Sequence, residues 1–539
     1  MVHSDVSMIT IEEIDIVKNE AQQGNSLAKL RLSIYYYFVG LYQEAYRYLV
    51  DVAVDQYYAK KLYILACLYK IGNPILKDLP RSQKIYQEVL GTIMKDAANG
   101  DVISQTLLGH AFYEGNGLDL DFEKAIHWFR LASKENSAIA LFYIGDASLN
   151  GNGTKETLKL AVGTFEASAA LNFLPAILVI GKMYLSGNHL IVTDYEKAYL
   201  YIVRAANAGY FDAINTLGKM YENGYGVEQN PSQAARLYYS VASLGHHMSQ
   251  NDLGTLLLEG RGVTRDEKQA FAWYKLSAEG GYPLGQYNYG ITLNRKTDSD
   301  KSDYRESYRY ILLAAKEGLM DAQLELAHYY ANGKAVELNL EESSRWLLLS
   351  AEQGNGEAAV ELGYNYEKGR GVPQNSFEAI RWYRYASNTG YLKGTVALGD
   401  CYAEGKGIEQ NDAEALRLYT LAASSGEPSG NNALGNAVFF GKLSQVQNRV
   451  LGAQYILEAA NNGDAKAQYN IGCLYLAGDG VELNYERAFY YYSLSASQDF
   501  PPAIYQIGVC YDGGYGVELN KEKAQEYFDR ATKLGFEGE

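Results

Sequence analysis

The sequence predicts an all-α protein, a right-handed α/α superhelical solenoid of about 14 helix-turn-helix repeats. Two observations predict this fold. A small residue recurs at a fixed interval along most of the chain, and each copy is surrounded by the same signals for where one helix stops and the next begins. Such self-similarity is typical of repeat proteins, in which each repeat packs on its neighbours. The 539 residues are therefore expected to form one array, although length alone would suggest several domains.

The interval between copies is 36 or 37 residues. The small residue usually follows Leu or Ile, as expected for the buried face of a helix. The regular copies are centred on Gly109, Gly145, Gly181, Gly218, Gly254, Gly290, Ala327, Gly363, Gly399, Gly435, Gly472 and Gly508. Two looser copies, centred on Ser33 and Ala66, come before them.

The copy around Gly218 illustrates the first helix of a repeat. Leu217, Gly218 and Tyr221 lie on one helical face. Glycine at the centre allows a second helix to approach closely, although it costs roughly 1 kcal/mol of helix propensity. Gly224 and Gly226 can adopt the positive φ angles that end this helix and turn the chain.

The second helix of that repeat begins at a good N-cap, Asn230, followed by Pro231 at the first helical position. An apolar stripe follows at helical spacing, and Gly245 ends the helix. The same caps recur in the other copies as Asp121, Asp194, Asp266, Asn339, Asn375, Asn411, Asn484 and Asn520. All four tryptophans occupy one repeat position, which favours core packing over a stacking platform.

Four segments are expected along the chain. Residues 1–23 form an N-terminal capping helix opened by a Thr10–Glu13 capping box, and residues 24–96 form two divergent repeats. Residues 97–535 form twelve regular repeats, and 536–539 are a tail. No polar capping helix is evident after the last repeat, so an open apolar end is expected there.

The regular repeats resemble the Sel-one-like repeat (SLR) family, a relative of the tetratricopeptide repeats. The segments LGTLLLEGRGVTRDEKQAFAWYKLSAEGG and LGYNYEKGRGVPQNSFEAIRWYRYASNTG follow that family's pattern closely. This resemblance implies a non-enzymatic adaptor or scaffold that binds partner proteins or peptides along the solenoid surface. Two alternatives stay open: a self-assembling structural solenoid, and an effector or toxin-neutralising (immunity-type) binding protein.

Composition and motifs favour binding over chemistry. A net charge of −16 argues against a general nucleic-acid binder, which needs a basic face. The four cysteines lie far apart, and the adjacent His246 and His247 lack partners at ligand spacing, so neither a metal site nor a cofactor is expected. The G-x-G loops join helices and are expected to be turns. No catalytic motif is found.

No signal peptide or long apolar stretch is visible, which predicts a cytoplasmic protein without membrane insertion. Export by a non-classical route stays open.

Candidate binding residues come from the first helix of each repeat, which normally lines the concave side of a solenoid. If the small residue is position zero, positions −3, +1 and +5 are expected to face this groove. In the middle copies they are polar and aromatic, which suits capture of an extended or helical peptide. Among them are Asn215, Lys219, Asn223, Tyr287 and Tyr364.

The same positions turn apolar toward the C-terminus, where they include Phe440, Tyr469, Cys473, Tyr505 and Val509. An exposed apolar patch marks an interface, and tyrosine is a favoured hot-spot residue. The last three repeats are therefore a candidate site for a partner or for self-association. The alternative is that these side chains are buried inside the array.

Overall fold

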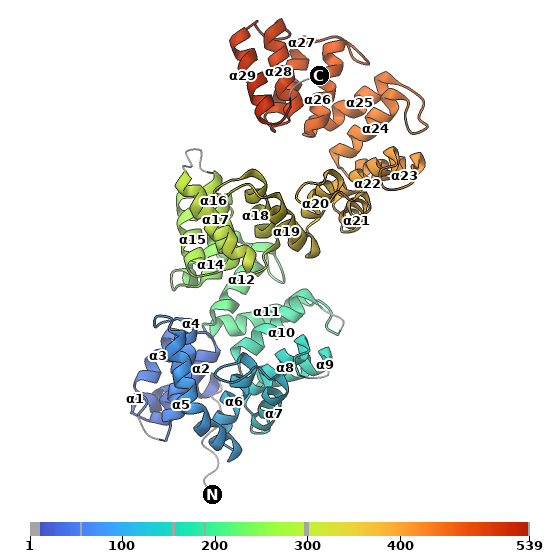
Figure 1. Ribbon diagram of the computed structural model, residues 1–539. Helices are drawn as coiled ribbons and strands as arrows, with labels where there is room; N and C mark the ends of the chain where they lie inside the picture. Colours follow the sequence, from blue (N-terminus) through green and yellow to red (C-terminus); the bar gives the residue numbers. More distant parts are fainter. Residues whose placement is uncertain (1–10, 54–55, 154–156, 188–189, 296–300, 537–539) are drawn as a thin grey trace. The chain divides into compact units, whose positions relative to one another are not determined.

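The computed structural model describes residues 11–53, 56–153, 157–187, 190–295 and 301–536, and the side chains of residues 11–13 and 301–302 are outside the description. Within these residues every secondary-structure element is an α-helix. After the single helix α1, helices α2 to α29 form fourteen consecutive pairs, so the predicted helical solenoid is confirmed (Figure 1). Within each of the two compact units of the chain, a helix packs mainly on the helices just before and after it in sequence.

The chain divides into two compact units, residues 1–280 and 281–539. The first unit contains α1 (Ile11–Gln22), α2 (Ser26–Phe38), α3 (Tyr42–Val50), α4 (Tyr58–Ile71), α5 (Leu79–Ala98), α6 (Val102–Glu114), α7 (Phe122–Ser133), α8 (Ala138–Asn150), α9 (Leu158–Ala170), α10 (Leu174–Ser186), α11 (Tyr195–Asn207), α12 (Phe211–Asn223), α13 (Pro231–Ala242), α14 (His247–Glu259) and α15 (Glu267–Glu279).

The second unit contains α16 (Pro283–Arg295), α17 (Lys301–Lys316), α18 (Met320–Asn332), α19 (Leu340–Glu352), α20 (Gly356–Lys368), α21 (Ser376–Asn388), α22 (Leu392–Glu404), α23 (Asp412–Ser424), α24 (Pro428–Phe440), α25 (Arg449–Asn461), α26 (Ala465–Ala477), α27 (Tyr485–Ala496), α28 (Pro501–Gly513) and α29 (Lys521–Lys533). None of the described helices has the length and apolar character needed to cross a membrane.

The small residue at position zero sets how closely the two helices of a repeat approach. In the repeat of Gly218, a Cβ added to the glycine would lie 2.4 Å from the Tyr238 ring, which is buried in the paired helix. Gly109 meets Phe129 and Gly472 meets Tyr492 in the same way. The glycine is therefore required by packing, as the sequence predicts.

The predicted turns and caps are present. Gly224 and Gly226 have φ angles of 75° and 68°. The carboxylate or amide oxygen of each predicted N-cap accepts a backbone N–H in the first turn of its helix, at Asp121, Asp194, Asn230, Asp266, Asn339, Asn375, Asn411, Asn484 and Asn520. The Thr10–Glu13 capping box lies outside the described residues and side chains.

Serine side chains also connect the two helices of a repeat. The hydroxyls of Ser168, Ser277 and Ser350 donate to the first-turn carbonyls of Ala138, His247 and Met320 at 2.7–2.8 Å. Each bond joins the second helix of a repeat to the first helix of the same repeat, 30 residues earlier. The hydroxyls are thereby satisfied inside the core.

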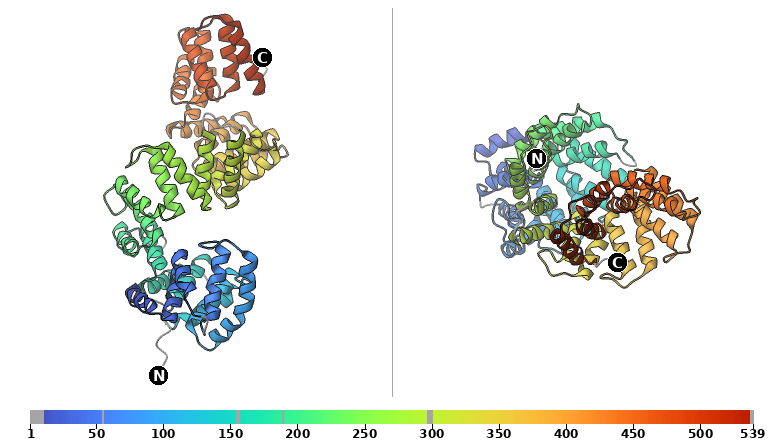
Figure 2. Two further views of the ribbon diagram at one scale, coloured as in Figure 1. Left: turned by 90° about the vertical axis from the view of Figure 1, so that its left-hand side faces the viewer. Right: turned by 90° about the horizontal axis from the view of Figure 1, so that it is seen from above.

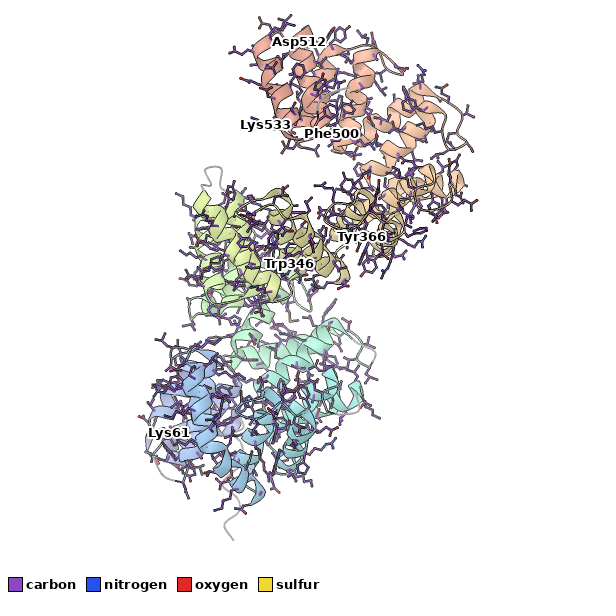
Figure 3. All side chains as sticks on the ribbon, viewed as in Figure 1. Lys61, Trp346, Tyr366, Phe500, Asp512 and Lys533 are labelled. Carbon is purple, nitrogen blue, oxygen red and sulfur yellow. The ribbon has the colours of Figure 1, made fainter. Side chains whose placement is uncertain are left out.

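The tryptophans mostly belong to apolar clusters. Trp382 is buried, and Trp128, Trp273 and Trp346 are half-buried. Trp346 of α19 and Tyr366 of α20, both labelled in Figure 3, pack against one cluster built from α18 to α21.

The expectation of an open apolar end after the last repeat is wrong for the described residues. In α27 the half-buried Phe489 and Leu494 are apolar, whereas the equivalent positions of α29 hold the exposed Gln525 and Arg530. The outer side of α29 is therefore polar.

Candidate functional site: the concave face of the second unit

The three predicted groove positions of the first helices differ in their exposure to solvent. Position +5 is exposed in the repeats from Asn223 to Gly513, and position +1 is half-buried or exposed from Lys219 to Val509. Position −3 is more enclosed, because the neighbouring first helix covers it. The expectation that all three positions face an open groove is therefore too broad.

Asn215 is the clearest correction. Its side chain is only 1% exposed, and its amide donates to Ser249 Oγ at 3.0 Å and to Asp252 Oδ2 at 2.8 Å. Asp252 also pairs with Lys219 at 3.2 Å. Asn223 is exposed and donates to the carbonyl of Lys219 at 2.9 Å. Asn215 thus joins α12 to α14 and offers no accessible surface.

A serine–histidine–aspartate arrangement adjoins Asn215. His246 Nδ1 lies 2.8 Å from Ser249 Oγ, and its Nε2 lies 2.9 Å from Asp212 Oδ1. The sequence gives no hint of this pairing, because Asp212 lies one repeat earlier. A nucleophile must be accessible to its substrate. Since Ser249 is fully buried, this network fixes α14 on α12 and has no route to acyl transfer.

The inner side of the first unit is filled by its own aromatic side chains. Phe38 of α2 lies 5.0 Å from the ring of His110 in α6 and 6.0 Å from that of Tyr143 in α8. Tyr63 OH of α4 lies 2.9 Å from His110 Nδ1. Burial lowers the pKa of His110 to about 3. One core cluster extends from Val17 to Met220, with α2 beside α6 and α8 (Figure 2).

The second unit keeps accessible polar side chains on its first helices. Glu325 and Glu361, at position −2 of α18 and α20, flank His328. His328 Nε2 lies 3.0 Å from the Glu361 carboxylate, and Nδ1 lies 3.9 Å from Glu325. Hydrogen bonds to Glu325 and Glu361 raise the pKa of His328 to about 10. Position −2 therefore lines the groove, which the sequence analysis missed.

A cavity of about 470 Å³ opens between α20 and α22. Its walls carry carboxylates, two tyrosines, one cysteine and two lysines, namely Glu361, Tyr364, Glu367, Tyr383, Asp400, Cys401, Glu404, Lys406 and Lys466, beside Val360 and Ala397. Burial raises the pKa of Cys401 to about 12, so its thiol stays protonated.

Core tyrosines of the second helices position two of these carboxylates. Tyr419 packs on Gly399, and its hydroxyl donates to Asp400 Oδ1 at 2.5 Å. Tyr383 packs on Gly363 in the same way and donates to Glu367 at 3.0 Å. Each ring crosses the repeat beneath its glycine, so that the hydroxyl reaches the concave side.

The groove desolvates Asp400 although the side chain is accessible to solvent. Crowding by protein atoms raises the pKa of this carboxyl, against the opposing effect of the Tyr419 hydrogen bond. Tyr391, just before α22, has its pKa raised to about 12 by burial and by the charges of Glu357 and Glu427. The inner side of α20 to α24 is thus both enclosed and acidic.

The predicted tyrosines of this unit differ in accessibility. Tyr364 is 43% exposed beside the cavity, with Lys368 Nζ and the Arg370 guanidinium each 5.8 Å from its ring centre. Tyr287 of α16 is half-buried, and burial followed by the charge of Asp321 raises its pKa.

The C-terminal candidates lie in a partly covered apolar region. Phe440 is 56% exposed at the end of α24, whereas Tyr469, Cys473, Tyr505 and Val509 are half-buried. Tyr469 packs 5.6 Å from Phe500, which Figure 3 labels at the start of α28. Tyr505 packs 4.9 Å from Phe528. The Cys473 sulfur accepts a hydrogen bond from Tyr492.

The described residues contain no group of three or more His, Cys, Asp or Glu side chains placed to hold a metal ion. The four cysteines are all free. The accessible chemistry of the groove is therefore that of charge, hydrogen bonding and aromatic contact, which suits recognition of another molecule.

A solenoid of consecutive helix pairs places the chain in the class of helical repeat proteins. Eleven segments match the family model described as Sel1 repeat, and together they cover well over half of the chain, which belongs to this family. The matched segments are residues 102–137, 175–210, 212–246, 247–282, 283–319, 321–355, 356–391, 393–427, 428–464, 465–500 and 501–536. Sel1 repeats are generally protein-interaction scaffolds and typically non-catalytic.

Solved structures similar to this chain include three bacterial proteins. A protective antigen of uropathogenic Escherichia coli with an SLR fold is 28% identical over 82% of this chain and 86% of its own, with a TM-score of 0.46. A Sel1 repeat protein from Oxalobacter formigenes is 29% identical over 46% and 96%, with a TM-score of 0.35. An immunity protein from Pseudomonas aeruginosa is 21% identical over 40% and 81%, with a TM-score of 0.33. No curated protein matches the chain.

Proposed function

We propose that this protein is a scaffold that holds a segment of a partner protein on the concave face of its second unit. The contrast between the units carries the proposal. The inner side of the first unit is occupied by Phe38, His110 and Tyr143, whereas that of the second keeps a cavity and an exposed tyrosine, Tyr364. The second unit therefore leaves room for a partner along its first helices.

The side chains around this cavity suit protein recognition. Exposed tyrosine contributes a large, rigid contact surface at low entropic cost, and such residues dominate binding energy at interfaces. The hydroxyls of Tyr383 and Tyr419 donate hydrogen bonds to the carboxylates of Glu367 and Asp400 and so fix their orientation. A partner would meet groups that are already oriented, which lowers the entropy cost of binding.

The test compares two tyrosines of similar exposure on different sides of the second unit. Tyr364 is 43% exposed on α20, and Tyr385 is 36% exposed on the second helix α21. Proteins captured by wild type from lysate of the source organism are identified, and the affinity of each purified partner is measured. Tyr364→Ala is expected to weaken binding by about tenfold or more, as for an interface hot spot. Tyr385→Ala should leave it unchanged, and the reverse pattern would contradict the proposal.

A second candidate function is self-association through the last three repeats, favoured by the exposed Phe440. Light scattering over a range of concentrations would show an oligomer that Phe440→Asp dissociates. A constant monomer mass would rule it out. The toxin-neutralising hypothesis has no feature among the described residues that favours it over other protein binding.

A further inference from the structure

Building on the proposed function, we infer that the partner segment is basic where it lies over α20 and α22 and apolar where it lies over α26 and α28. The inference names the chemistry of the partner, which the family does not. It depends on a change in character along the inner side of the second unit, from an acidic cavity to a half-buried apolar surface.

The acidic part contains carboxylates without an ion-pair partner, beside Glu404 and Glu367, which share Lys406. No ion pair joins Asp321, Glu357 or Asp400 to a basic side chain in the described part of the chain. Glu361 shares the single positive charge of His328 with Glu325. A lysine or arginine side chain entering here would meet excess negative charge at short range.

The cavity is an independent observation that points to a ligand at the same place. Its volume of about 470 Å³ opens on four carboxylates and two lysines, so that acidic groups outnumber basic ones: Glu361, Glu367, Asp400 and Glu404 against Lys406 and Lys466. Pockets of roughly 300–1,000 Å³ commonly hold small ligands or side chains. Desolvation of Asp400 costs the folded protein free energy, which an incoming cation would offset. The Tyr419 hydroxyl already holds this carboxylate in place.

The apolar part follows in the next repeats. At position +1, where α20 and α22 hold Tyr364 and Asp400, α26 and α28 hold the half-buried Cys473 and Val509. At position +5, where α20 and α22 hold Lys368 and Glu404, α26 and α28 hold Ala477 and Gly513, and the half-buried Tyr469 and Tyr505 lie beside them at position −3. Burying the remaining exposed area of these side chains against an apolar partner is favourable, at roughly 25 cal/mol per Å². A segment with Lys or Arg at one end and apolar residues at the other matches both parts.

The experiment measures binding of fluorescent synthetic peptides to the full chain by anisotropy. The first peptide joins a Lys/Arg block to a Leu/Phe block, the second has Glu in place of Lys and Arg, and the third has the basic block alone. The groove variant is Glu361→Gln/Asp400→Asn/Glu404→Gln. The control Glu352→Gln/Glu458→Gln/Glu526→Gln removes the same charge from exposed positions of the second helices.

The first peptide is expected to bind wild type. Its affinity should fall by about tenfold in the groove variant and by less than about twofold in the control variant. Val509→Thr, which preserves shape, should weaken the first peptide and spare the third. Equal losses in both charge variants would assign binding to the net charge of −16 and overturn the inference. Tighter binding of the Glu peptide would overturn it as well.

Failure of this inference is separable from failure of the proposed function. A cellular partner that Tyr364→Ala releases and the groove charge variant retains would overturn the basic character while leaving the concave site in place. A partner retained by both variants would overturn the concave site itself.

Discussion

At the scale of single residues, the glycine at position zero determines how closely the helices of a repeat approach. Gly218 leaves no space for a Cβ beside Tyr238, whereas a Cβ added to Gly163, in the middle of α9, would meet no atom of another helix within 4 Å. Replacement of glycine by alanine should therefore lower the stability of the protein at position 218 and raise it at position 163.

Gly218→Ala is expected to destabilise the protein by about 1–3 kcal/mol, because the new methyl group must displace a buried ring. Gly163→Ala should stabilise it by about 0.5–1 kcal/mol through helix propensity. Urea unfolding followed by circular dichroism measures both. A destabilised Gly163→Ala, or a neutral Gly218→Ala, would contradict this account of packing.

His328 should remain protonated far above neutral pH. Its folded pKa of about 10 exceeds the ordinary value of about 6.5. The stabilisation from its carboxylate partners is therefore fully present below about pH 6.5 and is lost as pH rises through about 10. Imidazole chemical shifts measured by NMR across this range give the pKa directly. Glu361→Gln should lower it, and a wild-type pKa near 6.5 would refute the arrangement.

His110 should make the first unit sensitive to acid. Its folded pKa of about 3 lies below the ordinary value of about 6.5. The unfolded chain therefore binds a proton first, and stability is lost as pH falls from about 6.5 toward 3. In unfolding curves recorded at several pH values, wild type should lose stability faster than His110→Gln over this range. Parallel losses in the two proteins would show that His110 does not contribute.

Residue-scale prediction from sequence works where the signal is local. Asn230 and Asn375 cap their helices as expected, because an N-cap depends only on the next few residues. The burial of Asn215 could not be predicted, because its partners Ser249 and Asp252 lie one repeat away. Position −2 was missed for the same reason: which residues flank a groove depends on the angle between neighbouring helices.

At the scale of elements, several second helices carry a tyrosine whose hydroxyl bonds a carboxylate of the first helix, as Tyr238, Tyr383 and Tyr419 do. In α21 the N-cap Asn375 accepts bonds from the N–H groups of Phe377 and Glu378 at 3.0 and 3.2 Å. The position of Tyr383, and with it that of Glu367, depends on the start of this helix.

Asn375→Ala is expected to cost about 1 kcal/mol of unfolding free energy, because two first-turn N–H groups lose their acceptor. Asn388→Ala, an exposed change in the last turn of the same helix, serves as the control and should have little effect. Thermal unfolding compares the two variants, and equal shifts would show that the cap contributes nothing.

At the scale of the whole molecule, the fold follows from repetition of local rules, which is why the solenoid could be predicted from spacing alone. Sequence spacing could not predict that aromatic side chains fill the inner side of the first unit. The contact of Phe38 with Tyr143 joins repeats that are far apart in sequence. This contact belongs to the core of the first unit. We propose that the inner face of the first unit serves its own stability, whereas that of the second is left for a partner.

The most direct test of that claim is site-specific photo-crosslinking in cells of the source organism. A photoreactive phenylalanine analogue replaces Tyr364, at the cavity of the second unit, or Tyr385, at similar exposure on the second helix α21. We expect position 364 to crosslink to one defined partner and position 385 to none. Crosslinking of the same partner from position 385 and not from 364 would contradict it.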